Sequence, residues 1–388
     1  MATTRHTPKE IEELYDSIPR VTQERSDFLL PQIVDFVQTK KWINIRPEYQ
    51  RRLVWDRKKK SRLIESLLMN VPVPPIFIYE HELSRYEIMD GQQRVNAILE
   101  FYDNDLKLTG LETWSALNGL TRRGCPDKIL RGLDRRRLSA TVLLAESADG
   151  SPESAHRIRR EVFERLNTGG QRLNAQELRN SQYGGSFNQL LIDLAGNTLF
   201  DEIWEIPPYE KHYNRETGQI GSELAKNDLF SRMIDCEIVL RFFAFRDASN
   251  IRGSVKDTLD RCMEFNQEAG QEKIKRMRDD FVCALETSHA IFGSNVFKIK
   301  NIKNRKPRWQ HSRPLFDAVM VSVHQLRDHG QALRDARHNV VNALNKELED
   351  ESSYEVIVGR PNTAAAVKKR IALVHGILKG AFHGRKRS

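Results

Sequence analysis

Residues 90 to 94 of the sequence are Asp-Gly-Gln-Gln-Arg and combine side chains suited to binding an anion. They follow an apolar stretch and precede a helical pattern, so they lie where a predicted strand turns into a predicted helix. The first turn of a helix has free backbone N–H groups and a partial positive charge, which attract phosphate. Gly91 lets a ligand approach the backbone closely. Arg94, one turn into the helix, could form a fork onto phosphate oxygens.

The remaining side chains of this segment leave several roles open. Gln92 and Gln93 offer amide donors and acceptors. Asp90 could hold a metal ion, orient a water molecule or cap the helix. The plainer alternative is an ordinary Asp-Gly turn in which Asp90 is only a cap. Five residues without their structural context do not decide between these interpretations.

Two further segments carry compatible chemistry. Residues 46–55 contain Tyr49, Gln50 and Arg51, and aromatic rings stack on bases while arginines hold phosphates. Residues 163–180 are rich in polar groups that we expect to crowd a loop between helices, namely Asn167, Thr168, Gly169, Gly170, Asn174, Glu177, Arg179 and Asn180. Each segment could equally be an ordinary polar loop with its capping residues.

The elements that must position the Asp90–Arg94 segment are short strands and a helix. Ile76–Tyr79 and Tyr86–Met89 are predicted to be two strands joined by a polar turn. The pattern that follows is helical, and it places one apolar face toward a core, formed by Val95, Ile98, Leu99 and Tyr102.

The first 150 residues or so contain further helices and strands. Apolar spacing predicts a helix at about 27–40, with Ser26 as its cap, and another within 56–70, with Asp56 as its cap. Residues 138–147 predict a strand. Because helices and strands alternate here, we expect a mixed α/β domain.

Strand signals vanish after about residue 155, and nearly every segment from 222 to 350 is amphipathic and helical. The sequence therefore predicts an α+β protein in which a mixed domain precedes an all-helical one. The expected divisions are an N-terminal arm (1–26), the mixed domain (27–185), the all-helical domain (186–380) and a basic tail (381–388).

The composition fits a globular protein, since 39% of the 388 residues are hydrophobic and 30% are charged. The net charge of +9 is concentrated in clusters, which suits DNA as a partner but is also compatible with solvated faces. We found no apolar run of membrane-spanning length and no secretory signal, so we expect a cytoplasmic protein without a membrane partner. The four cysteines are far apart, which predicts reduced thiols and no zinc site.

Four segments in this order resemble the N-terminal domain of the GmrSD family: "RPEYQRRLVW", "VPVPPIFIYE", "IMDGQQR" and "VFERLNTGGQRLNAQELRN". The similarity covers about residues 28 to 185. Members of this family belong to modification-dependent restriction systems and related anti-phage systems. The resemblance implies a ParB/sulfiredoxin-like fold for the mixed domain.

The resemblance also implies a function for the matching residues. It assigns binding and hydrolysis of a nucleoside triphosphate to Asp90–Arg94, with Asp90, Gln93 and Arg94 as catalytic candidates. Tyr49, Gln50 and Arg51 are implied to form a second wall of the same pocket. In restriction members of the family this hydrolysis is coupled to DNA cleavage, which is usually assigned to a separate C-terminal domain with a His-Asn-His metal centre.

The C-terminal half departs from that restriction pattern. Its histidines stand on predicted helices or beside basic runs, and none has the sequence context of such a centre. Arg370 and His375 have the spacing of HEPN ribonucleases, but so many arginines make one such pair expected by chance. We therefore predict no metal site of this kind and expect a partner nuclease or modification-system subunit to supply cleavage.

Three functions stay open at this point. The first is an NTPase of a defence system, slow and stimulated by DNA, in which Asp90 with Mg²⁺ orients water. The second is a sensor that binds a nucleotide or a modified base without turnover. The third is a nuclease that nicks DNA at the Asp90–Arg94 segment itself. The sequence leaves the nucleotide, the DNA and the oligomeric state open.

Overall fold

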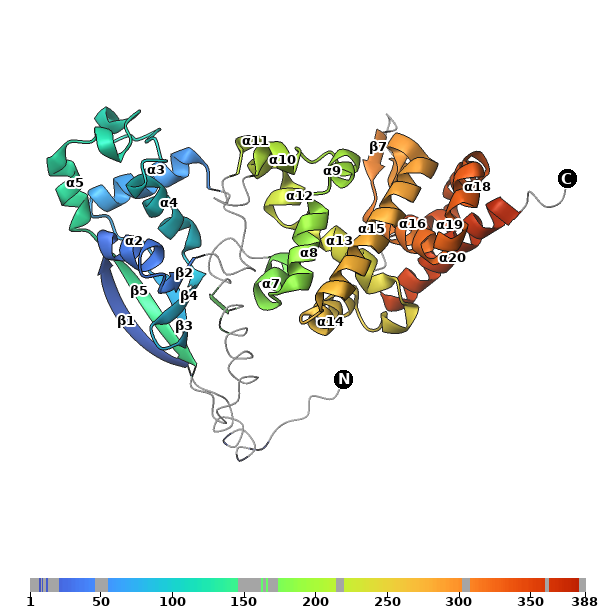
Figure 1. Ribbon diagram of the computed structural model, residues 1–388, viewed down its shortest axis with the longest axis horizontal. Helices are drawn as coiled ribbons and strands as arrows, with labels where there is room; N and C mark the ends of the chain where they lie inside the picture. Colours follow the sequence, from blue (N-terminus) through green and yellow to red (C-terminus); the bar gives the residue numbers. More distant parts are fainter. Residues whose placement is uncertain are drawn as a thin grey trace. The chain divides into compact units, whose positions relative to one another are not determined.

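The chain divides into two compact units, Met1–Leu173 (unit 1) and Asn174–Ser388 (unit 2), and each has its own hydrophobic core (Figure 1). Unit 1 contains a mixed sheet with helices and unit 2 is mainly helical, which confirms the predicted α+β class. Apart from a few isolated positions, the computed structural model describes residues 21–45, 55–145, 174–213, 220–301, 308–359 and 363–383.

A mixed sheet forms the base of unit 1, with the strand order β1-β5-β3-β4-β2 among the described residues. The central strand β3 pairs antiparallel with β4 and parallel with β5. At one edge, the short β2 runs parallel to β4. The strands are β1 (Val21–Leu29), β2 (Ile43–Asn44), β3 (Ile76–Glu82), β4 (Arg85–Asp90) and β5 (Arg137–Ala145). The predicted pair of strands is thus the β3–β4 hairpin, and β4 ends at Asp90.

The helices of unit 1 lie on one side of this sheet (Figure 1). They are α2 (Leu30–Gln38), α3 (Arg57–Leu68), α4 (Gln92–Tyr102) and α5 (Asp127–Asp134). Ile33 of α2 and Ile98 of α4 are fully buried in one core with Ile78 and Ile88 of the sheet. Asp56 caps α3 as predicted, because its carboxylate accepts a hydrogen bond from the amide of Lys59 at 2.7 Å.

The sequence did not reveal β1, which replaces the end of the expected arm and the first residues of the expected helix. β1 pairs antiparallel with β5 along its whole length, from Val21 opposite Ala145 to Leu29 opposite Arg137. Ser26 therefore lies inside a strand and does not cap a helix. An edge strand buries little of its surface, so β1 can be polar and lacks the apolar alternation that identifies a strand.

The described part of unit 2 is helical, as predicted, with the addition of one β-ribbon that the sequence did not predict. In this ribbon, β6 (Lys298–Asn301) pairs antiparallel with β7 (Arg308–His311). Ile299 is buried between two lysines, and so short an alternation does not stand out within a basic run. The helices are α7 (Ala175–Gln182), α8 (Ser186–Ala195), α9 (Thr198–Trp204), α10 (Tyr209–His212), α11 (Ser222–Lys226), α12 (Asp228–Ser231), α13 (Ile234–Phe245), α14 (Val255–Asn266), α15 (Gln271–Phe292), α16 (Arg313–Gln325), α17 (Gly330–Asp335), α18 (Arg337–Glu349), α19 (Glu351–Val358) and α20 (Ala364–His383).

Helix α13 lies in the middle of the unit 2 core. Its residues from Ile238 to Phe245 are all buried, and Phe242 contacts the ring of Phe281 from α15 edge-on. A helix that is apolar on all sides must be enclosed by others. Within the described ranges, no helix has both the length and the apolar character needed to cross a bilayer.

Burial lowers the pKa of three histidines in unit 2, namely His311, His324 and His375. A lowered pKa means that the unfolded chain takes up these protons before the folded chain does. The free energy of unfolding is therefore expected to fall as the pH drops below about 6.5, by up to about 1.4 kcal/mol per pH unit for each histidine that stays neutral. Urea unfolding at about pH 7.5 and about pH 5.5 measures this change.

A variant with glutamine at all three positions provides the control. Its carboxylates titrate as they do in the wild type, so the difference between the two proteins reports the histidines alone. The variant should lose less stability between the two pH values than the wild type. An equal loss in both proteins would show that these histidines do not set the pH dependence.

Candidate functional site

Gly91 is the single residue between β4 and α4, as the sequence predicts for the strand-to-helix junction. Its φ of 99° is left-handed, and no side chain caps the helix that follows. A Cβ at this position would lie 2.5 Å from Ile76 Cγ2 and 2.9 Å from Arg94 Nη2. Both the backbone angle and the space therefore require glycine here.

Asp90 and Arg94 form an ion pair across this junction. Arg94 Nη2 donates to Asp90 Oδ2 at 2.7 Å and to the carbonyl of Pro75 at 3.1 Å. The Arg94 side chain is only 15% exposed, whereas that of Asp90 is 45% exposed. Asp90 thus presents its carboxylate to solvent with the guanidinium behind it. Within the described part of the chain, the buried Nε of Arg94 has no hydrogen-bond partner.

Gln92 and Gln93 contact the two ends of the segment that precedes α3. Gln92 is buried and its Nε2 donates to the carbonyl of Ile45 at 2.8 Å. Gln93 Oε1 accepts from the backbone amide of Trp55 at 3.2 Å. Tyr49, Gln50 and Arg51 belong to the intervening residues 46–54 and lie outside the described residues. The two glutamines therefore fix the chain on either side of the predicted second wall.

Several polar residues were expected to form a loop that supports the site. Those that the structure describes lie in a helix instead. Glu177, Arg179 and Asn180 are buried residues of helix α7, in unit 2. This helix starts there because Asn174 and Glu177 form a capping box. Other members of the expected loop lie outside the described residues, namely Asn167, Thr168, Gly169 and Gly170.

Helix α3 carries one of the basic clusters, and only part of it is free for a polyanion. Lys60 Nζ bonds Glu100 at 2.6 Å, and Arg62 bonds Glu112 at the same distance. Arg57, Lys58 and Lys59 are exposed on the first turn of the helix. These three side chains remain the candidates for contacts with a phosphate backbone.

The contribution of Pro75 and Ile76 to the junction was missed in the sequence. The Pro75 carbonyl positions Arg94, and the Ile76 side chain fills the space beside Gly91. The Pro74-Pro75 pair before β3 could have indicated this role. Proline has no backbone N–H and interrupts regular strand pairing, so a carbonyl in such a pair can accept a hydrogen bond from a side chain. The ion pair itself follows the i, i+4 spacing of Asp90 and Arg94.

The histidines of the C-terminal half are spread over separate elements, with His311 on β7, His324 on α16 and His375 on α20. Among the described residues, no group of three or more histidine, cysteine, aspartate or glutamate side chains could hold a metal ion. Arg370 is buried and donates to the carbonyls of Val356 and Gly359. Its guanidinium is therefore part of the fold of unit 2.

Comparison with protein families places the junction within a known domain. Residues 32–184 match the family model described as "GmrSD restriction endonuclease, N-terminal domain", and this range includes Asp90–Arg94. No curated protein and no solved structure is similar enough to match the chain. The matched range continues through α7, beyond the division between the two units at Leu173. Residues 32–184 of this chain are therefore similar to the N-terminal domain of the GmrSD family.

Proposed function

We propose that this protein is a nucleotide-binding and hydrolysing component of a restriction or anti-phage system that works with DNA. The similarity of residues 32–184 to the N-terminal domain of the GmrSD restriction endonucleases supports the broad role. The β4–α4 junction supports the finer one. The observation that carries it is an uncapped helix start beside a glycine, with a half-exposed carboxylate and a mostly buried arginine at the same place.

Each part of the junction suits one part of a triphosphate. The start of α4 supplies N–H groups and a partial positive charge, and Gly91 removes the side chain that would block a phosphate. Arg94 places a guanidinium within the same turn, and its buried Nε lacks a partner among the described residues. A buried polar atom left unpaired costs about 1–3 kcal/mol, so a ligand or water that satisfies it is favoured.

The anchors of residues 46–54 support a two-walled pocket. The chain leaves Ile45 next to Gln92 and returns at Trp55 next to Gln93. Both described ends of the segment that contains Tyr49, Gln50 and Arg51 are thus held at the junction. In this proposal, Tyr49 stacks on the base, and Arg51 together with Arg94 neutralises the charge that builds up on the phosphates.

Asp90 orients the attacking water in this mechanism. Mg²⁺ typically binds one or two carboxylates together with the phosphates of the substrate, and the half-exposed Asp90 fits that pattern. The ion, when bound with the nucleotide, would supply further charge neutralisation. Arg57, Lys58 and Lys59 are the proposed contacts to the DNA backbone, which explains why DNA should stimulate turnover.

Purified protein should release phosphate slowly from one or more nucleoside triphosphates and do so faster with DNA. Asp90→Ala and Arg94→Ala are expected to lower turnover by about 100-fold, because each removes a group that acts on the developing charge. A panel of nucleotides, with and without DNA, measures binding and phosphate release in parallel. Arg62→Ala is the matched control, since it removes an arginine from an exposed ion pair on the adjacent helix α3.

The outcomes separate this function from the two alternatives. Equal turnover in the wild type and both site variants would reject the junction as the hydrolytic site. Binding of nucleotide without phosphate release would indicate a sensor. Metal-dependent nicking of a plasmid that is lost in Asp90→Ala would indicate a nuclease, with no need for a partner subunit.

A further inference from the structure

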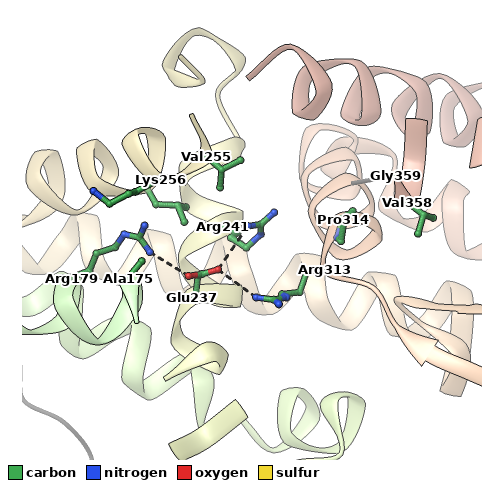
Figure 2. Close-up of a pocket in the computed structure, with 11 residues that line it drawn as sticks. Ala175, Arg179, Glu237, Arg241, Val255, Lys256, Arg313, Pro314, Val358 and Gly359 are labelled. Atoms are coloured by element: carbon green, nitrogen blue, oxygen red, sulfur yellow. Dashed lines mark hydrogen bonds and ion pairs between the residues drawn. The ribbon is translucent and has the colours of Figure 1, made fainter. Parts of the chain in front are cut away.

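Unit 2 contains a cavity of about 400 Å³ that the function proposed above does not use. Figure 2 shows Arg179, Arg241 and Arg313 around Glu237, with Lys256 on the Arg179 side and its terminal nitrogen pointing away from Glu237. This volume lies in the range of small-molecule sites, which run from about 300 to 1,000 Å³. The charged residues that line the cavity are Arg179, Glu237, Arg241, Lys256 and Arg313.

Among these lining residues, three arginines surround the carboxylate of Glu237. Glu237 lies 3.4 Å from Arg179 Nη1, 3.9 Å from Arg241 Nη1 and 3.6 Å from Arg313 Nη1 (Figure 2). These separations are longer than a normal N–H···O hydrogen bond of about 2.7–3.2 Å. Glu237 therefore partly neutralises the charge of the three guanidinium groups but makes no short hydrogen bond to any of them.

The buried arginines have closer partners outside the cavity, whereas the exposed cations Arg313 and Lys256 are held by longer ion pairs. Arg179 donates to Asp260 at 2.6 Å, and Arg241 makes a bidentate pair with the buried Asp317. In the described chain, the contact with Glu237 is the one ion pair of Arg313, whose side chain is 49% exposed. Lys256 is 65% exposed, and its ion pair among the described residues is with Asp260, at 3.3 Å. The side chains of Arg313 and Lys256 can therefore reorient toward a ligand with little loss of existing interactions.

Helices α7, α13, α14 and α16 all begin at this cavity. Ala175 is the first residue of α7, Glu237 lies in the first turn of α13, and the other two helices contribute their first two residues, Val255–Lys256 and Arg313–Pro314. Caps from Asn174, Ser254 and Ser312 take up some of the free N–H groups, but the helix dipoles remain. Their positive ends add to the charge of the arginines, and both favour an anion.

The remaining wall of the cavity is apolar. Val255 and Leu259 of α14 lie on one side, and Pro314 and Val358 complete the lining. A bare inorganic ion would leave this surface without a partner. A ligand with a flat apolar part and a charged group would contact both surfaces.

We propose that this cavity binds a nucleoside monophosphate, with its phosphate at Arg313 and Lys256 and its base against Val255, Leu259 and Pro314. The site is independent of the β4–α4 junction, because all of its residues belong to unit 2. It gives the helical unit a means to respond to a soluble nucleotide. The phosphate competes with Glu237 for Arg313.

Titration calorimetry of the full chain with AMP, GMP, CMP and UMP tests this site, with inorganic phosphate as the reference ligand. We expect at least one nucleotide to bind more tightly than phosphate, and affinity to fall by about 10-fold in Arg313→Gln and in Lys256→Gln. Both side chains are exposed, so the variants should keep the thermal stability of the wild type. Lys346→Gln, an exposed lysine on α18, is the matched control and should change nothing.

Glu237→Gln provides a readout of opposite sign. It removes the competing carboxylate, so nucleotide affinity should rise, which a purely structural role of Glu237 would not produce. Arg94→Ala must leave this binding unchanged, which separates the site from the junction. Nucleotide binding no tighter than that of phosphate, unchanged affinity in Arg313→Gln, or weaker binding in Glu237→Gln would each overturn the proposal.

Discussion

Gly91→Ala should destabilise unit 1 by about 2–6 kcal/mol and abolish activity at the junction. The methyl group would be forced to a left-handed φ of 99°, and strain of this kind costs about 1–3 kcal/mol. It would also meet Ile76 Cγ2 at 2.5 Å, and overpacking of this kind typically costs another 1–3 kcal/mol. Urea unfolding of the variant and the wild type measures the difference.

Activity should be lost beyond what the stability change explains, because the same methyl group lies 2.9 Å from Arg94 Nη2. Arg94 would have to leave its position beside Asp90. Gly132→Ala is the matched control, since Gly132 lies within α5 and an added Cβ there has no neighbour within 4 Å. That change should be neutral or stabilising by up to about 1 kcal/mol. Similar stability in both variants would contradict the close packing at Gly91.

Asp317→Ala should destabilise unit 2 by about 3–5 kcal/mol, the usual cost of removing one partner from a buried ion pair. Asp317 is fully buried and accepts two hydrogen bonds from Arg241. Burial by itself lowers the pKa of Arg241, but the carboxylates of Asp317 and Glu237 outweigh it and hold the pKa above its ordinary value. Without Asp317, the mostly buried Arg241 would keep its charge with only the longer 3.9 Å contact to Glu237 among the described residues. Thermal unfolding monitored by circular dichroism measures the loss.

A variant at the surface tests whether burial is the cause. Glu112→Ala breaks an ion pair of similar length with Arg62, but both side chains are more than half exposed. It should change stability by no more than about 0.5 kcal/mol, since exposed pairs contribute little. If Asp317→Ala proved as mild as this control, the buried pair would not organise the core of unit 2.

The sequence was most informative where the pattern is local and strongly periodic. The β3–β4 hairpin, the cap of α3 at Asp56 and the face of α4 depend on neighbouring residues, and all of them are present in the structure. β1 and the β6–β7 ribbon were missed because their pairing partners, not their own composition, make them strands. Local patterns do not contain that information.

The same distinction separates the two sites. Asp90, Gly91 and Arg94 are near neighbours in the chain, so their meeting at the junction was predictable from spacing alone. Arg179, Glu237, Lys256 and Arg313 come from four different helices, and only the packing of unit 2 brings them together. Arg179 was noticed for its polarity but was assigned to a loop of the mixed domain, residues 27–185. No spacing rule could have paired it with Asp260.

The helix α7 has a consequence for how this protein should be cut into fragments. The family match ends at residue 184, yet α7 packs with α13 and α14 in unit 2. A fragment that stops at 184 would contain α7 without the helices that it packs against. Arg179 would lose its hydrogen bond to Asp260, and the buried side chain of Asn180 would become exposed to solvent. The remaining fragment would lose Ala175 and Arg179, which line its charged cavity. The end of the family match at residue 184 and the structural boundary of unit 1 at Leu173 therefore differ. A truncated protein should end at the structural boundary.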